Sequence, residues 1–212
     1  KVVVPKPGSY RSSVKSIGDP ADIEKLADIL VKAERPAVLL GQQVWSSRGH
    51  EDAINFIRAL DIPAYMNGAS RGMLPQSDPH HFDRTRSDAF KNADVILIVG
   101  TPFDFRMGYG KRISKEATLV QVDQSYATVG KNRDISLGLA GDPGAILAAV
   151  SQAITGHIDN GARQQRQKWM AELRAIEATK LDKLMPMFTT DQNPIHPYRL
   201  AYEINEFLGE DT

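Results

Sequence analysis

The run of five apolar residues from Val95 to Val99 (VILIV) is the feature that most constrains the fold of this 212-residue chain. A short, β-branched run with no polar position is typical of a strand that is buried on both faces, as in a parallel sheet. Gly100 ends the run, and a turn with Thr101, Asp104 and Arg106 follows it. Because ligands of parallel α/β sheets bind at the carboxyl ends of the strands, this turn is the first place to expect a ligand.

Helical and strand patterns alternate along the chain on both sides of this run. Apolar residues at helical spacing, with Pro and Asp at expected starts, predict helices at about 20–35, 49–61, 86–92 and 143–154. Short apolar runs predict further strands at 36–41, 62–67, 117–123 and 134–141. This alternation predicts an α/β fold with a doubly wound, mostly parallel, Rossmann-like sheet of about five to six strands over residues 20–158.

The two ends of the chain differ from this central part. Residues 1–19 are punctuated by Pro, Gly and Ser without a period, so we expect a linker from a preceding domain. Residues 159–212 predict a long charged amphipathic helix and a second helix, that is, a helical connector and the start of a following domain. The chain is therefore expected to be part of a longer protein. Five aromatic or sulfur-containing side chains are expected to pack against neighbours in the connector: Trp169, Met170, Tyr198, Tyr202 and Phe207.

Composition excludes several function classes. The formal net charge is zero, which argues against a nucleic acid or an anionic membrane as partner. The absence of cysteine excludes disulfides, thiolate nucleophiles and Cys-ligated metals. No membrane span or signal peptide is visible, so we expect a cytoplasmic protein. His80 and His81 are adjacent and lack a completing carboxylate trio, and no nucleophile-elbow pattern occurs, so neither a metal site nor a catalytic residue is predicted.

The motifs in their order resemble the central domain of thiamine-diphosphate-dependent enzymes of the acetolactate synthase, 2-hydroxyacyl-CoA lyase and oxalyl-CoA decarboxylase group. They are a strand ending in Gly, then IPAYMN with RGMLP, ADVILIVG with its polar turn, VQVD and LAGDP, over residues 20–155. The resemblance implies a parent enzyme that forms or cleaves a C–C bond next to a carbonyl with thiamine diphosphate and Mg²⁺. It also implies a 2-oxo acid or acyl-CoA substrate and a homodimer or homotetramer.

In this family the catalytic Glu and the Gly-Asp-Gly motif for Mg²⁺ normally lie in the flanking domains. Gly141-Asp142-Pro143 does not match that motif. The chain alone is therefore expected to be inactive.

The resemblance further implies an ADP-containing nucleotide, FAD, ADP or CoA, at the carboxyl edge of the sheet. Gly41 would let the backbone approach a diphosphate, or it simply ends a strand. Asp123 would accept hydrogen bonds from ribose hydroxyls, or it is a helix cap or a solvated acid in a loop. Asp142 would contact the adenosine, or it is an ordinary N-cap before Pro143. The candidate cofactor-binding residues are Gly41, Gln42, Gly100, Thr101, Phe103, Arg106, Asp123 and Asp142.

Two positions depart from the pattern of nucleotide-binding members. Gln42 replaces a second glycine that is common in the FAD-binding enzymes. Pro102 stands where many members have an Arg that contacts the nucleotide, and because Pro has neither charge nor donor, that contact is missing. Arg106 could supply the cation from the same turn, or it could pair with Asp104.

Arg86-Ser87 is similar to an Arg-Ser pair of the acyl-CoA-using members, so Arg86 is the candidate residue for CoA binding. Arg71 and Arg84 flank the same His- and Ser-rich loop, and planar guanidinium groups match phosphate oxygens. The alternative is that all three are solvated loop arginines.

Two other functions stay open. The chain could be a stand-alone nucleotide-binding domain of similar topology, such as NAD-dependent deacylases or the third domain of transhydrogenase. The absence of zinc-binding cysteines and the poor glycine loop Gly41-Gln42-Gln43 weigh against it. The chain could also be a structural spacer that binds no ligand.

Overall fold

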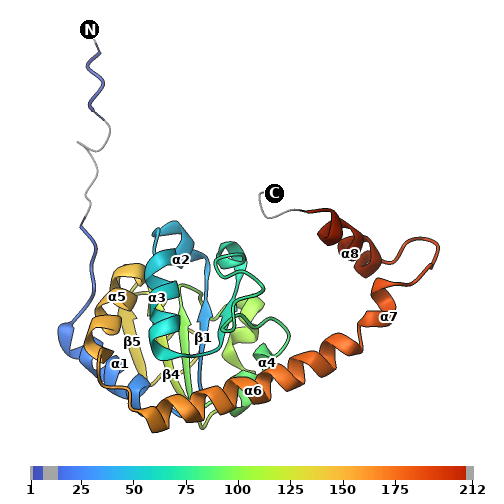
Figure 1. Cartoon of the computed structure of the whole chain (residues 1–212). Helices are drawn as coiled ribbons and strands as arrows, with labels where there is room; N and C mark the ends of the chain where they lie inside the picture. Colours follow the sequence, from blue (N-terminus) through green and yellow to red (C-terminus); the bar gives the residue numbers. More distant parts are fainter. Residues whose placement is uncertain (1, 7–13, 209–212) are drawn as a thin grey trace.

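The computed structural model describes residues 2–6 and 14–208, so part of the predicted linker at 1–19 lies outside the described residues. Figure 1 shows an α/β unit, a long helix beneath it, and two short helices that rise beside it. Within the described ranges, no helix combines the length and hydrophobicity that crossing a bilayer requires.

The sheet has five strands, all parallel, in the order β2-β1-β3-β4-β5. This confirms the predicted α/β fold. Leu40 at the end of β1 lies opposite Val99 at the end of β3, so these two strands end at the same level. Since β2 and β3 leave β1 on opposite sides, the carboxyl ends of β1 and β3 form the switch point of the sheet. The strands are β1 (Pro36–Leu40), β2 (Ala64–Met66), β3 (Val95–Val99), β4 (Thr118–Asp123) and β5 (Leu137–Ala140).

One face of the sheet is covered by the helices α1 (Pro20–Lys32), α3 (His50–Leu60) and α5 (Pro143–Ile154). Their starts follow from local chemistry. Asp19 caps α1 by accepting a hydrogen bond from the Ala21 amide at 2.8 Å, before a Pro at the first helical position. The periodic apolar residues of α1 predicted from the sequence are the buried ones: Ile23, Leu26, Ala27 and Leu30.

The other face is covered by α4 (Arg86–Asn92), by loops and by α6 (Asn160–Asp182). Trp169 and Leu173 of α6 are buried in this second core, and Met170 is partly buried against it. The predicted packing of Trp169 and Met170 is confirmed. Although the predicted division placed α6 after the central domain, α6 closes part of the core of the α/β unit.

Short elements complete the chain: α2 (Gln42–Ser46), η1 (Gly68–Ser70), η2 (Phe105–Gly110), α7 (Met185–Phe188) and α8 (Pro197–Phe207). The rings of Tyr198 and Tyr202 in α8 lie 6.0 and 5.7 Å from the ring of Phe188. The prediction that α8 buries its aromatic face is nevertheless wrong within the described part of the chain. Phe207 is 89% exposed and α8 has no buried residue, because α7 alone offers it little apolar surface.

Candidate functional site

Gly41 and Gly100 bring the ends of β1 and β3 into direct contact. A Cβ on Gly41 would lie 1.8 Å from the Thr101 Oγ1 and 2.3 Å from the Gly100 carbonyl oxygen. Gly100 has a φ of +67°, and its own Cβ would lie 2.8 Å from that of Gln43. Both glycines are thus required by contacts within the chain, since no side chain fits between the two strand ends.

Asp123 ends β4 and is fully buried. Its Oδ1 accepts hydrogen bonds from the Gln43 Nε2 at 3.1 Å and from the Ser125 amide at 2.8 Å. Its Oδ2 is buried and has no partner among the described residues. A buried acceptor without a donor is costly, so this oxygen is the atom of the strand-end region that a ligand hydroxyl would satisfy.

Arg106 and Asp142 have partners inside the chain. The Arg106 Nε and Nη2 donate to the Asp104 Oδ2 at 2.9 and 2.6 Å. The hydrogen-bonded Arg106 guanidinium holds the pKa of the Asp104 carboxyl below its usual range. Asp142 caps α5 by accepting from the Ala145 amide at 2.9 Å, and it pairs with Lys15 at 3.6 Å. The alternatives raised from the sequence, a surface ion pair and an N-cap, are therefore the arrangements that the structure contains.

The other predicted nucleotide-binding residues lie around these two strand ends in different environments. Phe103 is buried in the second core, and its carbonyl accepts from the Asn132 Nδ2 at 3.0 Å. Thr101 is buried against Gly41, whereas Gln42 is exposed at the start of α2. Of the polar side chains in the predicted set, Asp123 is the one that retains an unpaired buried atom in the described part of the chain.

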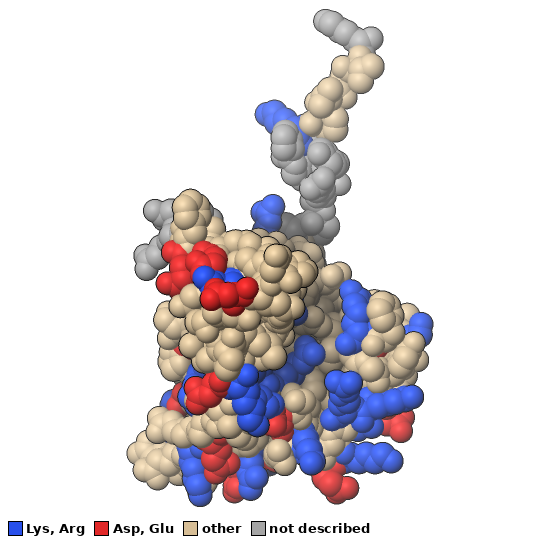
Figure 2. All heavy atoms as spheres, turned by 90° about the vertical axis from the view of Figure 1, so that its right-hand side faces the viewer, with Lys and Arg blue, Asp and Glu red and all other residues tan. Residues whose placement is uncertain are grey.

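A cavity of about 1240 Å³ lies between the α/β unit and the C-terminal helices α7 and α8, and we call it the arginine cavity. Five arginines line it: Arg71, Arg84, Arg86, Arg106 and Arg112. Figure 2 looks at this side of the molecule and shows Lys and Arg side chains interspersed with Asp and Glu over its lower part. Among the residues that the structure describes, no acceptor contacts the guanidinium groups of Arg71, Arg84, Arg86 or Arg112. Asp83 is the one carboxylate in the lining.

The remaining walls of the arginine cavity are largely apolar and aromatic. The α/β unit contributes Phe82, Phe90, Met107 and Ile113, and the C-terminal helices contribute Leu184, Met185, Phe188, Tyr198 and Tyr202. Tyr65 lies deeper, and its hydroxyl is 3.0 Å from the Thr85 Oγ1. Burial raises the pKa of Tyr65, so its phenol stays protonated. Unpaired guanidinium groups beside aromatic surface suit a ligand that combines phosphates with a planar or apolar part.

The structure brings together the three arginines that were singled out from the sequence, Arg71, Arg84 and Arg86. It adds Arg112, which sequence reasoning missed. Arg112 lies in a loop without a motif, and no signal in the sequence places it opposite residues 71–86. Its place in the cavity follows only from the tertiary fold.

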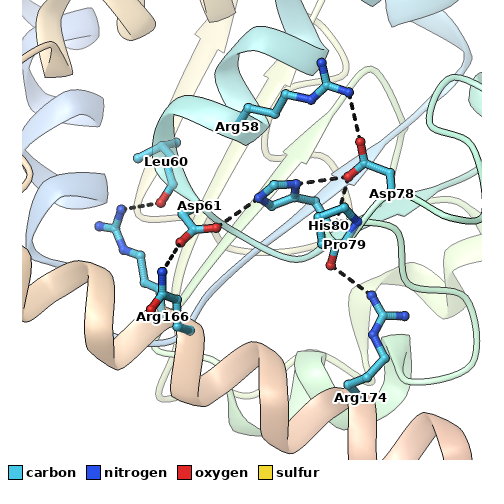
Figure 3. A network of polar contacts seen from close by, with 9 residues as sticks. Arg58, Leu60, Asp61, Asp78, Pro79, His80, Arg166 and Arg174 are labelled. Carbon is cyan, nitrogen blue, oxygen red and sulfur yellow. Dashed lines mark hydrogen bonds and ion pairs between the residues drawn. The ribbon is translucent and has the colours of Figure 1, made fainter.

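A polar network ties the loop before α4 to α3 (Figure 3). The His80 Nδ1 lies 3.0 Å from the Asp78 Oδ1, and its Nε2 lies 2.9 Å from the Asp61 Oδ1. The Arg58 Nη2 donates to the Asp78 Oδ2 at 2.9 Å. This network anchors the loop whose next residues line the arginine cavity.

The described residues do not fit a metal site. His81 turns away from His80 and contacts the Asp83 Oδ1 at 3.1 Å and the Pro75 carbonyl at 3.1 Å. Within the described ranges, no three His, Cys, Asp or Glu side chains are placed to hold a metal ion together. The described residues therefore show no preformed cluster of side chains that would hold the Mg²⁺ of the family.

Comparison with known proteins places the chain among characterised relatives. Residues 23–150 match the thiamine pyrophosphate enzyme central domain. The acetolactate synthase large subunit of Mycobacterium tuberculosis is 32% identical over 190 residues, which cover 90% of this chain and 33% of that protein. The 2-hydroxyacyl-CoA lyase 2 of Homo sapiens is 28% identical over 193 residues, or 87% of this chain and 30% of that protein. Oxalyl-CoA decarboxylase of Escherichia coli is 24% identical over 193 residues, which cover 91% of this chain and 34% of that protein.

The fold is also shared with a solved structure. Benzoylformate decarboxylase from Polynucleobacter necessarius superposes with a TM-score of 0.58 at 18% identity, over 73% of this chain and 30% of that chain. The chain thus spans about a third of the length of the curated relatives that it matches. Because the family match covers more than half of its residues, the chain belongs to the thiamine pyrophosphate enzymes, and residues 23–150 are the central domain of that family.

Proposed function

We propose that this chain is the central domain of an enzyme that forms or cleaves a C–C bond next to a carbonyl, on a 2-oxo acid or acyl-CoA substrate. Thiamine diphosphate and Mg²⁺ would be held by other parts of a longer protein, which would act as a homodimer or homotetramer. The domain itself would contribute binding, in the arginine cavity, of the phosphate-bearing ADP part of an acyl-CoA.

The observation that carries this proposal is the set of unpaired arginines around one cavity. Arg71 and Arg84 lie in the segment between η1 and α4, Arg86 is the first residue of α4, and Arg112 comes from the loop after η2. The four guanidinium groups outnumber the carboxylate of Asp83 in the lining and repel one another, so an anion that enters between them gains favourable Coulomb energy from each. The chain carries no net charge, so this cluster is a local feature rather than a consequence of a basic protein.

Calorimetric titration of CoA, ADP and FAD into the chain tests the proposal. We expect CoA to bind and Arg86→Ala to weaken it about tenfold, as the loss of one charge-assisted phosphate contact predicts. Arg35→Ala is the control, because Arg35 is an exposed arginine that does not line the cavity. If none of the three ligands binds, the binding role is refuted.

A nucleotide at the strand ends is the second candidate, favoured by the unpaired Asp123 Oδ2. An Asn at this position would keep the Oδ1 acceptor but replace Oδ2 with a donor, which cannot accept from a ribose hydroxyl. If Asp123→Asn weakens ADP or FAD binding and Arg86→Ala does not, the nucleotide binds at the strand ends instead. The opposite pattern favours the arginine cavity.

A separate experiment tests the proposal that this chain alone is catalytically inactive. The chain mixed with thiamine diphosphate, Mg²⁺ and pyruvate is expected to form no acetolactate, because the described residues offer no metal site. Turnover in that mixture would contradict the assignment of a purely binding role to this domain.

A further inference from the structure

Three side chains on one face of α6 hold the loop that lines the arginine cavity. Arg174, Glu177 and Lys180 follow one another at helical spacing. The Glu177 Oε1 accepts hydrogen bonds from the backbone amides of both Asp83 and Arg84, each at 2.8 Å.

Arg174 and Lys180 extend the same row of contacts. The Arg174 Nη2 donates to the carbonyls of Pro79 and His81 at 2.9 and 3.0 Å. The first of these two contacts is drawn in Figure 3. The Lys180 Nζ donates to the Arg84 carbonyl at 3.0 Å.

Apart from the Arg174 guanidinium, which also lies over the Phe82 ring at 3.8 Å from its centroid, these contacts reach the backbone of residues 79–84. They therefore set the path of the loop without engaging the Arg84 side chain. The guanidinium groups of Arg84 and Arg86 contact no acceptor in the described part of the chain. Their position is thus determined by the backbone that carries them, and that backbone is held by α6.

Glu177 lies behind the arginine cavity rather than in it. It lines a smaller neighbouring cavity of about 240 Å³, which shares Asp83 and Arg84 with the large one. Its side chain is almost fully buried, and its Oε2 accepts from the Arg174 Nη1 at 2.8 Å. A carboxylate that accepts from two backbone amides and a guanidinium is held in place, since three of its about four acceptor sites are engaged.

We propose that Glu177 is a positioning residue for anion binding. By holding the amides of Asp83 and Arg84, it fixes where the guanidinium groups of Arg84 and Arg86 enter the arginine cavity, and so sets the affinity of that cavity for a phosphate-bearing ligand. This inference rests on the proposed binding of such a ligand in the cavity.

Simple electrostatics makes the opposite prediction, which allows a sharp test. If Glu177 acted only through its charge, it would repel an anion, so Glu177→Gln would strengthen binding and Glu177→Asp would leave it unchanged. If Glu177 acts by position, Glu177→Asp weakens anion binding and Glu177→Gln leaves it nearly unchanged. Asp keeps the charge but is one methylene shorter and cannot reach the two amides in place. Gln keeps the reach and an acceptor oxygen.

The experiment titrates inorganic pyrophosphate into the chain at low salt and follows binding by calorimetry. We expect Glu177→Asp to raise the Kd about tenfold and Glu177→Gln to change it about twofold or less, since only the first loses the hydrogen-bond geometry. Glu172→Ala is the control on the same helix, because the Glu172 side chain is exposed and makes no hydrogen bond or ion pair with a described residue.

The outcomes separate the two proposals. If the unmodified chain does not bind pyrophosphate, the proposed function fails at the cavity itself. If it binds and both Glu177 variants bind equally well, Glu177 is merely structural and the positioning role is overturned. Lys180→Ala, which removes the contacts to the Arg84 carbonyl and to the Asp88 carboxylate, supplies a second test should Glu177→Asp fail to fold. It is expected to weaken pyrophosphate binding, and unchanged affinity would overturn the inference.

Discussion

At the strand ends Gly41 contacts Gly100 and Thr101 and the Asp123 Oδ1 accepts two hydrogen bonds, whereas in the arginine cavity four guanidinium groups contact no described acceptor. The first region looks like a binding site in the sequence and is largely filled by the chain itself. The second has no glycine motif and leaves its charges available. The polar groups at the strand ends are therefore mostly engaged inside the chain, which is why the proposed ligand is assigned to the arginine cavity.

Substitutions in both regions test this difference. The largest loss of unfolding free energy is expected where α6 is attached to α1 and α3. The Arg166 guanidinium of α6 is fully buried and donates to the Leu30 and Leu60 carbonyls at 2.5 and 2.7 Å, at the ends of α1 and α3. Figure 3 shows it reaching up from α6 to Leu60. Arg166→Met leaves these carbonyls buried without donors and should cost about 4 kcal/mol of unfolding free energy, measured by denaturant titration. Arg163→Met, an exposed change on the same helix, should cost almost nothing.

The next effect is expected at the strand ends. Gly41→Ala places a methyl group in the backbone of Gly100 and should lower the unfolding free energy by about 3 kcal/mol. Gly72→Ala is the control, since no atom lies within 4 Å of its Cβ and only its φ of +89° opposes the change. A Gly41→Ala protein as stable as the Gly72→Ala protein would show that the strand ends can separate, and would reopen this region to a ligand.

A smaller, pH-dependent effect is expected in the network that anchors the loop. Burial alone would raise the pKa of Asp78, but hydrogen bonds from His80 and Arg58 outweigh it and hold the pKa below its usual value. Because the folded-state pKa is the lower one, the charged carboxylate stabilises the fold above the unfolded pKa of about 4, and this stability is lost as the pH falls through the folded pKa. Asp78→Asn should cost about 1–2 kcal/mol at neutral pH and flatten the acid limb of the stability curve. An unchanged acid limb would contradict this account.

The smallest effect on stability is expected inside the cavity. Arg86→Ala and Arg112→Ala should each change the unfolding free energy by less than about 0.5 kcal/mol, because neither guanidinium contacts a described acceptor. Relief of repulsion between the arginines should make any change favourable at low salt and smaller at high salt. A loss well above this value in thermal or denaturant unfolding would mean that these arginines are structural.

Much of the fold followed from local patterns. The buried runs predicted the strands, and Asp19-Pro20 and Asp142-Pro143 predicted helix starts that the structure contains. These signals are visible in the sequence because each depends on neighbours a few residues away. The aromatic face of α8 was misread because amphipathicity shows which residues prefer burial but not whether a partner lies nearby.

The candidate site was less predictable, because several of its residues come from segments that are far apart in the sequence. Arg71, Arg84 and Arg86 stood out through their loop, but Arg112 and Glu177 reach the cavity region from segments far away in the chain. Glu177 contacts amides more than ninety positions earlier, and no local pattern encodes such a contact.

The parallel α/β sheet and the family resemblance could thus be predicted from the sequence, because the hydrophobic period, the caps and the strand-end motifs are local properties. Which polar groups have a hydrogen-bond or ion-pair partner follows only from the tertiary structure. Whether a carboxylate or guanidinium is paired depends on which distant atoms the folded chain brings within about 3 Å of it. The folded chain brings Gly41 against Gly100 and Thr101, and it places no described acceptor at the guanidinium groups of Arg71, Arg84, Arg86 and Arg112.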